Sequence, residues 1–157
     1  MEAVIIVTIK EKIKLFKNEE EATKVELITF DEVGFSVVSQ KDLYKIGDKA
    51  IFILPDYCVS DIAIFQDFIA PGGDISKSYL GKIEGQPRRI RAKKFNLHTG
   101  DRMPVYSNGI LLPLSMVALH LEYYVNTLIE EYRLNPDFLT SILGITKYEQ
   151  PEEPIKM

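Results

Sequence analysis

The sequence predicts a mostly β domain with a C-terminal helix, and two patterns of residues lead to this prediction. Short apolar segments rich in β-branched and aromatic residues, bounded by turn residues, recur through residues 1–115. Beyond them, the apolar residues change from the spacing of a strand to the spacing of a helix. Short strands at such regular spacing favour a small antiparallel barrel or sandwich over parallel strands joined by crossover helices.

Six segments carry the strand pattern, and turn residues separate them. Gly47, between the third segment and the fourth, can supply the positive φ of a tight turn. Pro113 lies within the last segment, where a proline favours an edge strand or a strand end because it has no N–H for a central ladder. Residues 57–68, between the fourth segment and the fifth, fit a short helix or an irregular apolar plug. The six segments are residues 4–9, 25–30, 35–38, 50–54, 89–95 and 109–114.

A helical period begins after the last strand segment. Apolar residues recur at steps of four and three, with polar residues between them, at Leu121, Val125, Leu128 and Tyr132. This pattern predicts one amphipathic helix over residues 117–134. Asp137 can cap a short second helix that runs to residue 143, and Gly144 can end it.

These elements divide the chain into three parts. We expect the barrel over residues 1–115 and a helical extension packed on the barrel over residues 116–147. Residues 148–157 contain two prolines and three glutamates but a single isoleucine, which is typical of an exposed tail or linker.

Composition and charge exclude several classes of protein. The chain of 157 residues is 46% hydrophobic and 27% charged, an ordinary globular mixture, and its net charge of −4 excludes a globally basic nucleic-acid coat protein. The sequence has no apolar stretch of about 18 residues and no signal-peptide pattern, so we expect a cytoplasmic protein without membrane contact. Because the chain has one cysteine, Cys58, and two histidines, a zinc cluster of cysteines is excluded and no metal site is expected.

Local charge is the sharpest functional signal. Residues 82–102 hold seven basic and two acidic side chains, a net charge of +5 within a chain of net charge −4. In strand geometry Arg89, Arg91 and Lys93 share one face and can follow successive phosphates along a groove. A solvated strand face with no ligand is the alternative. The candidate contacts are Arg88, Arg89, Arg91, Lys93, Lys94 and Arg102, with Tyr79, Phe95 and Tyr106 as the nearest aromatic side chains for stacking.

The chain shows no convincing active site. Residues 82–85, Lys-Ile-Glu-Gly, nearly match the Lys-x-Asp-Gly tetrad with which covalent nucleotidyltransferases attack a nucleotide. That chemistry also requires a purine pocket, metal-binding carboxylates and further lysines, and the sequence offers no such set. A turn that contains Lys82 is the better interpretation, so we expect no catalytic residue and no covalent nucleotide adduct.

Several segments together follow the pattern of one family, and the most specific are residues 108–114, Asn-Gly-Ile-Leu-Leu-Pro-Leu, and residues 143–149, Leu-Gly-Ile-Thr-Lys-Tyr-Glu. These segments resemble the ATP-dependent RNA ligases of the RNA ligase 5 type, which carry an OB module before the nucleotidyltransferase domain. The resemblance implies a five-stranded OB-type antiparallel barrel. The matching segments occur in the family's order and are residues 25–30, 34–38, 45–56, 89–95, 106–115 and 143–149.

The resemblance implies a non-catalytic module that binds RNA, as a single strand or a nicked duplex, and positions its ends for sealing. In the family, the adenylylated lysine and the metal ligands lie in the domain after residues 143–149. We therefore expect a nucleotidyltransferase partner chain, with ATP and magnesium bound only there. The six basic residues named above would contact phosphates, and Tyr106 a sugar or a base.

Two other interpretations remain at this stage. In the first, the chain is a protein-interaction adaptor that docks a partner through the helix at residues 117–134 and has no nucleic-acid role. In the second, which has the least support, the chain is an autonomous ligase that uses Lys82. The chain itself could be a standalone protein, half of a split ligase or a shortened piece of one.

Overall fold

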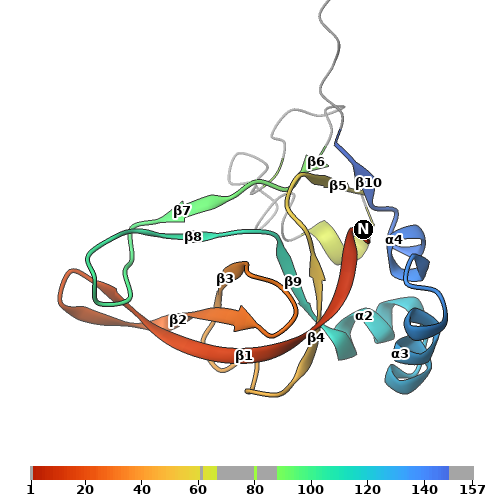
Figure 1. Cartoon of the computed structure of the whole chain (residues 1–157), viewed down its shortest axis with the longest axis horizontal. Coiled ribbons are helices and arrows are strands. Elements are labelled where there is room, and N and C mark those ends of the chain that lie inside the picture. The colour runs from red at the N-terminus through yellow and green to blue at the C-terminus, as the bar shows by residue number, and fades with distance from the viewer. Residues whose placement is uncertain (1, 61, 67–79, 81–87, 149–157) are drawn as a thin grey trace, which may run out of the picture.

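A computed structural model describes residues 2–60, 62–66, 80 and 88–148. Its largest element is a five-stranded antiparallel sheet in the order β3-β2-β1-β4-β9, which curls into a half-barrel (Figure 1). The predicted fold class, mostly β with C-terminal helices and an OB-like antiparallel sheet, is confirmed. The strands are β1 (Val4–Lys17), β2 (Glu20–Phe30), β3 (Ser36–Gln40), β4 (Lys49–Ile53) and β9 (Ile110–Pro113).

Strand β1 curls the sheet because its two halves pair with different neighbours. Its first half pairs with β4, from Val4 opposite Ile53 onward, and its second half pairs with β2, ending at Lys17 opposite Glu20. Two irregularities interrupt the pairing with β2, and such bulges bend a strand and increase its twist. The part of β1 beyond the barrel therefore forms, with β2, a long ribbon that extends away from the core (Figure 1).

Two features of the strands follow the sequence prediction. The turn before β4 contains Gly47 at a φ of +90°, the left-handed region that glycine adopts without strain. Pro113 is the last residue of β9, which lies at one end of the strand order, so a missing N–H costs no ladder bond there.

A two-stranded ribbon lies across the open side of the half-barrel, above β2 and β3 (Figure 1). It consists of β7 (Lys93–Phe95) and β8 (Val105–Ser107). Two hydrogen bonds tie its end to β3: the Val38 N–H donates to Ser107 Oγ at 3.0 Å, and the Asn108 N–H donates to the Ser36 carbonyl at 2.9 Å.

The prediction of one strand over residues 89–95 is wrong. The segment splits into β6 (Arg88–Arg89), which pairs with β5 (Tyr57–Val59), and β7, which pairs with β8. The break falls after β6 because Ile90, only 1% exposed, turns into the core. Its N–H donates to the Tyr57 carbonyl, and its carbonyl accepts from the Asp56 N–H.

The prediction of one helix over residues 117–134 is also wrong. The chain forms α2 (Leu114–Leu121) and α3 (Val125–Leu134), separated by Glu122 at a left-handed φ of +61°. The Glu122 N–H caps α2 by donating to the carbonyls of Ala118 and Leu119. The break lets both helices place an apolar face in one core, because Val117 and Leu128 are each fully buried there.

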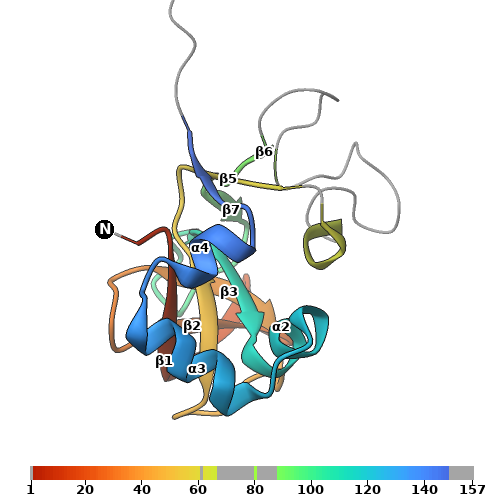
Figure 2. The same ribbon diagram turned by 90° about the vertical axis from the view of Figure 1, so that its right-hand side faces the viewer.

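A third helix, α4 (Phe138–Ile142), agrees with the predicted short helix. Asp137 occupies the N-cap position as predicted, although its side chain makes no capping hydrogen bond. Gly144 ends the segment at a φ of +68°. The chain then forms β10 (Thr146–Lys147), which pairs with β5, while α4 lies against β1 (Figure 2).

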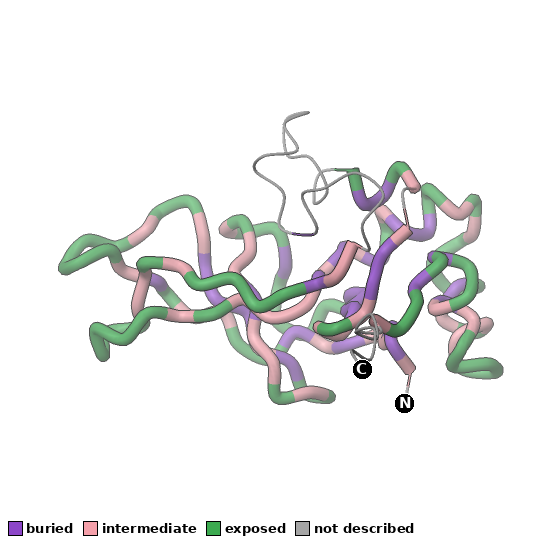
Figure 3. Tube along the Cα trace, turned by 90° about the horizontal axis from the view of Figure 1, so that it is seen from above, coloured by how far each residue is buried: buried purple, intermediate pink, exposed green. Residues whose placement is uncertain are grey.

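The core has two parts, one on each face of β4. Ile51 and Ile53 point into the cluster shared with the helices, whereas Ala50 and Phe52 point into the cluster inside the half-barrel. All four side chains are fully buried, and buried residues concentrate in the middle of the molecule (Figure 3).

Residues 57–68 begin with β5, where a helix or an irregular plug was expected. A 3₁₀ turn follows at Ala63–Phe65 and buries Phe65 completely, while residues 61, 67 and 68 lie outside the described part of the chain. Of the predicted tail over residues 148–157, only Tyr148 lies within the described part of the chain. Across the described residues, the helices are too short or too polar to cross a membrane.

Candidate functional site

The short segment from β6 to β7 positions most of the candidate basic residues. Residues 88–94 carry five cations among seven residues. Because the segment changes from one sheet to another at Ile90, these cations do not form the single row that a continuous strand would give. They lie instead in separate environments, described in turn below.

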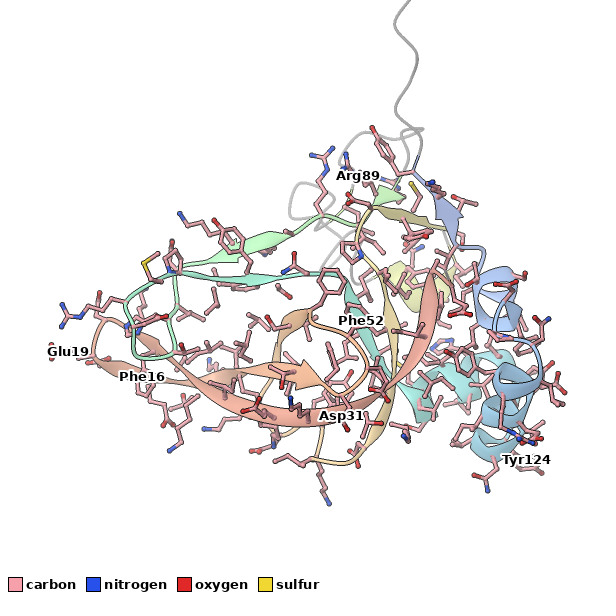
Figure 4. All side chains as sticks on the ribbon, viewed as in Figure 1. Phe16, Glu19, Asp31, Phe52, Arg89 and Tyr124 are labelled. Carbon is pink, nitrogen blue, oxygen red and sulfur yellow. The ribbon has the colours of Figure 1, made fainter. Side chains whose placement is uncertain are left out.

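Arg89 is engaged in the fold. Its Nη2 donates to Asp56 Oδ1 at 2.6 Å and its Nε to the same oxygen at 3.1 Å. The guanidinium also lies 4.3 Å from the centre of the Tyr148 ring. The hydrogen bond that the guanidinium donates to the Asp56 carboxylate raises the pKa of Arg89 above its ordinary value. Arg89 therefore joins the turn before β5 to the residue after β10, at the upper edge of the molecule in Figure 4.

Arg88 belongs to the same short strand. It is half-buried and lies opposite Val59 in the pairing of β6 with β5. The structure therefore places Arg88 beside Arg89 at the three-stranded sheet, and away from the ribbon that carries Lys93 and Lys94.

Arg91 and Lys93 border a cavity of about 220 Å³ between β3, β9 and the β7–β8 ribbon. Its deeper walls are apolar, since Val37, Ile90 and Ile110 are each less than 5% exposed. Arg91 is exposed, and across the described residues it forms no ion pair or hydrogen bond. Lys93 is exposed too, with its Nζ 5.2 Å from the centre of the half-buried Phe95 ring. Two cations thus lie at the mouth of an apolar cavity.

Lys94 and Tyr106 occupy the other face of the ribbon. They are direct cross-strand partners, whereas Lys93 lies opposite Ser107 on the cavity face. Both are exposed, Tyr106 at 49%. This face can offer one cation and one aromatic ring to a ligand outside the cavity.

Arg102 lies apart from the other candidates. It pairs at 3.5 Å with Glu19, a residue at the tip of the β1–β2 ribbon, and both side chains are at least 80% exposed. Figure 4 shows Glu19 at the far end of the molecule from Arg89. An exposed pair of this kind contributes little to stability. Two other candidates of the sequence analysis, Tyr79 and Lys82, lie outside the described residues.

Sequence reasoning missed Asp56, the partner that separates Arg89 from the other cations of residues 88–94. Asp56 ends an apolar run next to a proline and looks like an ordinary turn residue, so no sequence signal assigns it to Arg89.

Gly109, in contrast, lies within residues 108–114, a segment whose sequence pattern was specific enough to draw attention to it. Its φ is +87°, and a Cβ there would lie 2.5 Å from Phe52 Cζ. The glycine allows the chain to enter β9 directly over that ring.

Within the part of the chain that the structure describes, no cluster of three or more His, Cys, Asp or Glu side chains has a metal-binding arrangement.

Comparison with known proteins finds solved structures whose fold resembles this one. No protein-family model and no curated protein matches the sequence. The RNA ligase of Naegleria gruberi with pyrophosphate matches over 98% of this chain and 37% of that chain, with a TM-score of 0.60 and 23% identity. Its variant with ATP and manganese matches over the same shares at 24% identity and a TM-score of 0.60.

The chain shares its fold with part of that ligase. A variant without ligand gives a TM-score of 0.58 and 25% identity, over 96% of this chain and 36% of that chain. This chain therefore spans little more than a third of the length of the solved ligase. The match covers almost the whole of this chain, so the likeness is not confined to one of its elements.

Proposed function

We propose that this chain is the RNA-binding OB module of an RNA ligase, and that it positions RNA or duplex ends for sealing by a nucleotidyltransferase domain in another chain. The observation that carries the proposal is the exposed Arg91, unpaired among the described residues, beside Lys93 at the mouth of the cavity. It occurs on a fold shared with part of a protein that is an RNA ligase by name. Among RNA ligases, the sequence resemblance favours the RNA ligase 5 type for this module.

Charge supports RNA as the partner. Residues 88–94 concentrate five cations on a chain of net charge −4, and such a local excess attracts a polyanion. Arg91, Lys93 and Lys94 are exposed and can approach phosphates, while Tyr106 can stack on a base or a sugar. ATP and magnesium belong, in this proposal, to the nucleotidyltransferase partner.

One observation favours the adaptor as the second candidate. The helices and the link between α2 and α3 expose large apolar side chains, with Leu119 78% exposed, Tyr124 85% and Leu134 72%. Tyr124 lies at the outer end of the helices in Figure 4, far from Arg89. A protein partner that covered these side chains would leave the basic segment in solvent.

The decisive experiment measures binding of the full chain to fluorescent RNA, single-stranded and as a nicked duplex, at two salt concentrations. We expect binding that weakens as salt rises, since each phosphate contact releases counterions. Binding of neither RNA at low salt would reject the proposal in favour of the adaptor. Incubation of the same chain with labelled ATP and magnesium should give no covalent adduct, and a labelled band would contradict the absence of catalysis.

A further inference from the structure

The cavity beside β3 is large enough for one nucleobase. A dry apolar cavity of about 150 Å³ accommodates a benzene ring, and the volume here is about 220 Å³. Its deeper walls are formed by three buried apolar side chains, Val37, Ile90 and Ile110, which have almost no contact with water. A flat ring that entered would exchange contact with water for contact with apolar side chains, which is favourable in proportion to the area buried.

The mouth of the cavity has the groups that a nucleotide requires next to its base. Phe95 forms part of the wall and offers a ring, and Lys93 lies over that ring at 5.2 Å. Arg91, exposed beside them, has five N–H donors in a planar fork that suits a phosphate. An apolar slot with cations at its entrance matches a base whose own phosphates stay outside.

We propose that this cavity binds a single extruded base of an RNA strand, with the phosphates that flank this base held by Arg91 and Lys93. The inference rests on the proposed function and adds a base site to it. Lys94, exposed on the other face of the same ribbon, is a further cation and favours a polyanion over a ligand with one phosphate. Bases reach such a slot from single strands, loops or frayed ends, where they are already unstacked.

The test compares two probes of equal length and charge: a fluorescent oligouridylate and the same ribose-phosphate chain without bases. The full chain should bind the oligouridylate about tenfold more tightly, since stacking of one base is worth roughly 1–3 kcal/mol. Equal affinity for the two probes would overturn the base site while leaving RNA binding intact. Binding of neither probe would reject the proposed function itself, and the base site with it.

A variant that fills the cavity gives an independent test. Leu111 lines the cavity from β9 and is half-buried, so L111W should narrow it. We expect this variant to bind the oligouridylate more weakly than the wild type does, by most of the tenfold preference, and to bind the probe without bases with unchanged affinity. L119W adds the same ring on the exposed face of α2 and should retain the tenfold preference. A folded L111W protein, verified by circular dichroism, that kept the preference would contradict the site.

Discussion

Arg89 is fixed against Asp56, with its Nη2 2.6 Å from the carboxylate oxygen Oδ1. Two residues further along, the exposed Arg91 has no such partner within the described residues. Neighbouring arginines of one basic segment therefore have different roles. The first joins β5, β6 and the residue after β10, and the second is available to a ligand.

Substitution of Arg89 and of Arg91 should separate these roles. R89Q should lower the thermal midpoint by a few degrees, because the pair with Asp56 and the contact with Tyr148 are lost, and should leave the salt dependence of RNA binding unchanged. R91Q should retain the midpoint and reduce the slope of log K against log salt by about 0.7, the value for one phosphate contact on a single strand.

The control for these variants is R133Q, which removes one charge from α3, where Arg133 pairs with Glu130 on the exposed surface. R133Q should have the same slope of log K against log salt as the wild type. A reduced slope in R89Q with an unchanged midpoint would show that Arg89 contacts phosphate.

Gly109 should tolerate no side chain. In G109A the new Cβ would meet Phe52 Cζ at 2.5 Å and the Ile53 carbonyl oxygen at 2.6 Å, on a backbone at a φ of +87°. Backbone strain and overpacking together should cost about 2–5 kcal/mol in the free energy of unfolding, measured in urea. G100A shares the positive φ, at +117°, but meets nothing within 4 Å. If both variants lose the same free energy, the contact with Phe52 adds nothing.

Tyr44 is buried with a hydroxyl that has no hydrogen-bond partner among the described residues. Removal of that hydroxyl in Y44F should stabilise the fold by about 1 kcal/mol or more at neutral pH, because an unpaired buried polar group costs about 1–3 kcal/mol. Urea denaturation at pH 7 measures the difference. A destabilised Y44F protein would show that the hydroxyl does have a partner.

Burial raises the pKa of Tyr44 well above its ordinary value, and this gives a second measurement. Above a pH of about 10 the unfolded chain releases the phenolic proton while the folded chain retains it. Ionisation of Tyr44 therefore leaves the free energy of unfolding unchanged below that pH and lowers it as the pH rises further. The wild type should lose more stability than Y44F between pH 9 and 11, and equal losses would contradict the assignment.

Glu122 separates α2 from α3 with a left-handed backbone that favours glycine. E122G should therefore raise the free energy of unfolding by up to about 1 kcal/mol. E131G places the same substitution within α3 and should lower it by about 1 kcal/mol. A loss of stability in E122G similar to that in E131G would mean that the two helices are one in solution.

The strands of the main sheet could be predicted because each is a local pattern bounded by turn residues. The division of residues 89–95 could not, since Ile90 and its cationic neighbours alternate as they would in a continuous strand. What breaks that strand is the bonding of Ile90 to Tyr57 and Asp56, which are distant in sequence. The helix break at Glu122 could not be predicted for a similar reason, because the apolar residues keep their helical spacing across it.

The candidate site was predictable in composition but not in arrangement. A count of charges was enough to find the basic segment. Its division depends on Asp56, 33 residues before Arg89, and on a cavity whose walls come from β3, β7 and β9. Contacts between residues so far apart in the sequence produce no periodic pattern from which they could be predicted.

The seam between β3 and the end of the β7–β8 ribbon has a consequence for local opening of the fold. Two hydrogen bonds close this seam, from Val38 to Ser107 and from Asn108 to Ser36, whereas β4 is paired along both edges. Regions with few such bonds open at a lower free energy than the global transition. The amides of Val38 and Asn108 should therefore exchange with deuterium well before those of β4. Since Val38 and Ser107 also line the cavity, we expect the fold to open first beside the proposed base site.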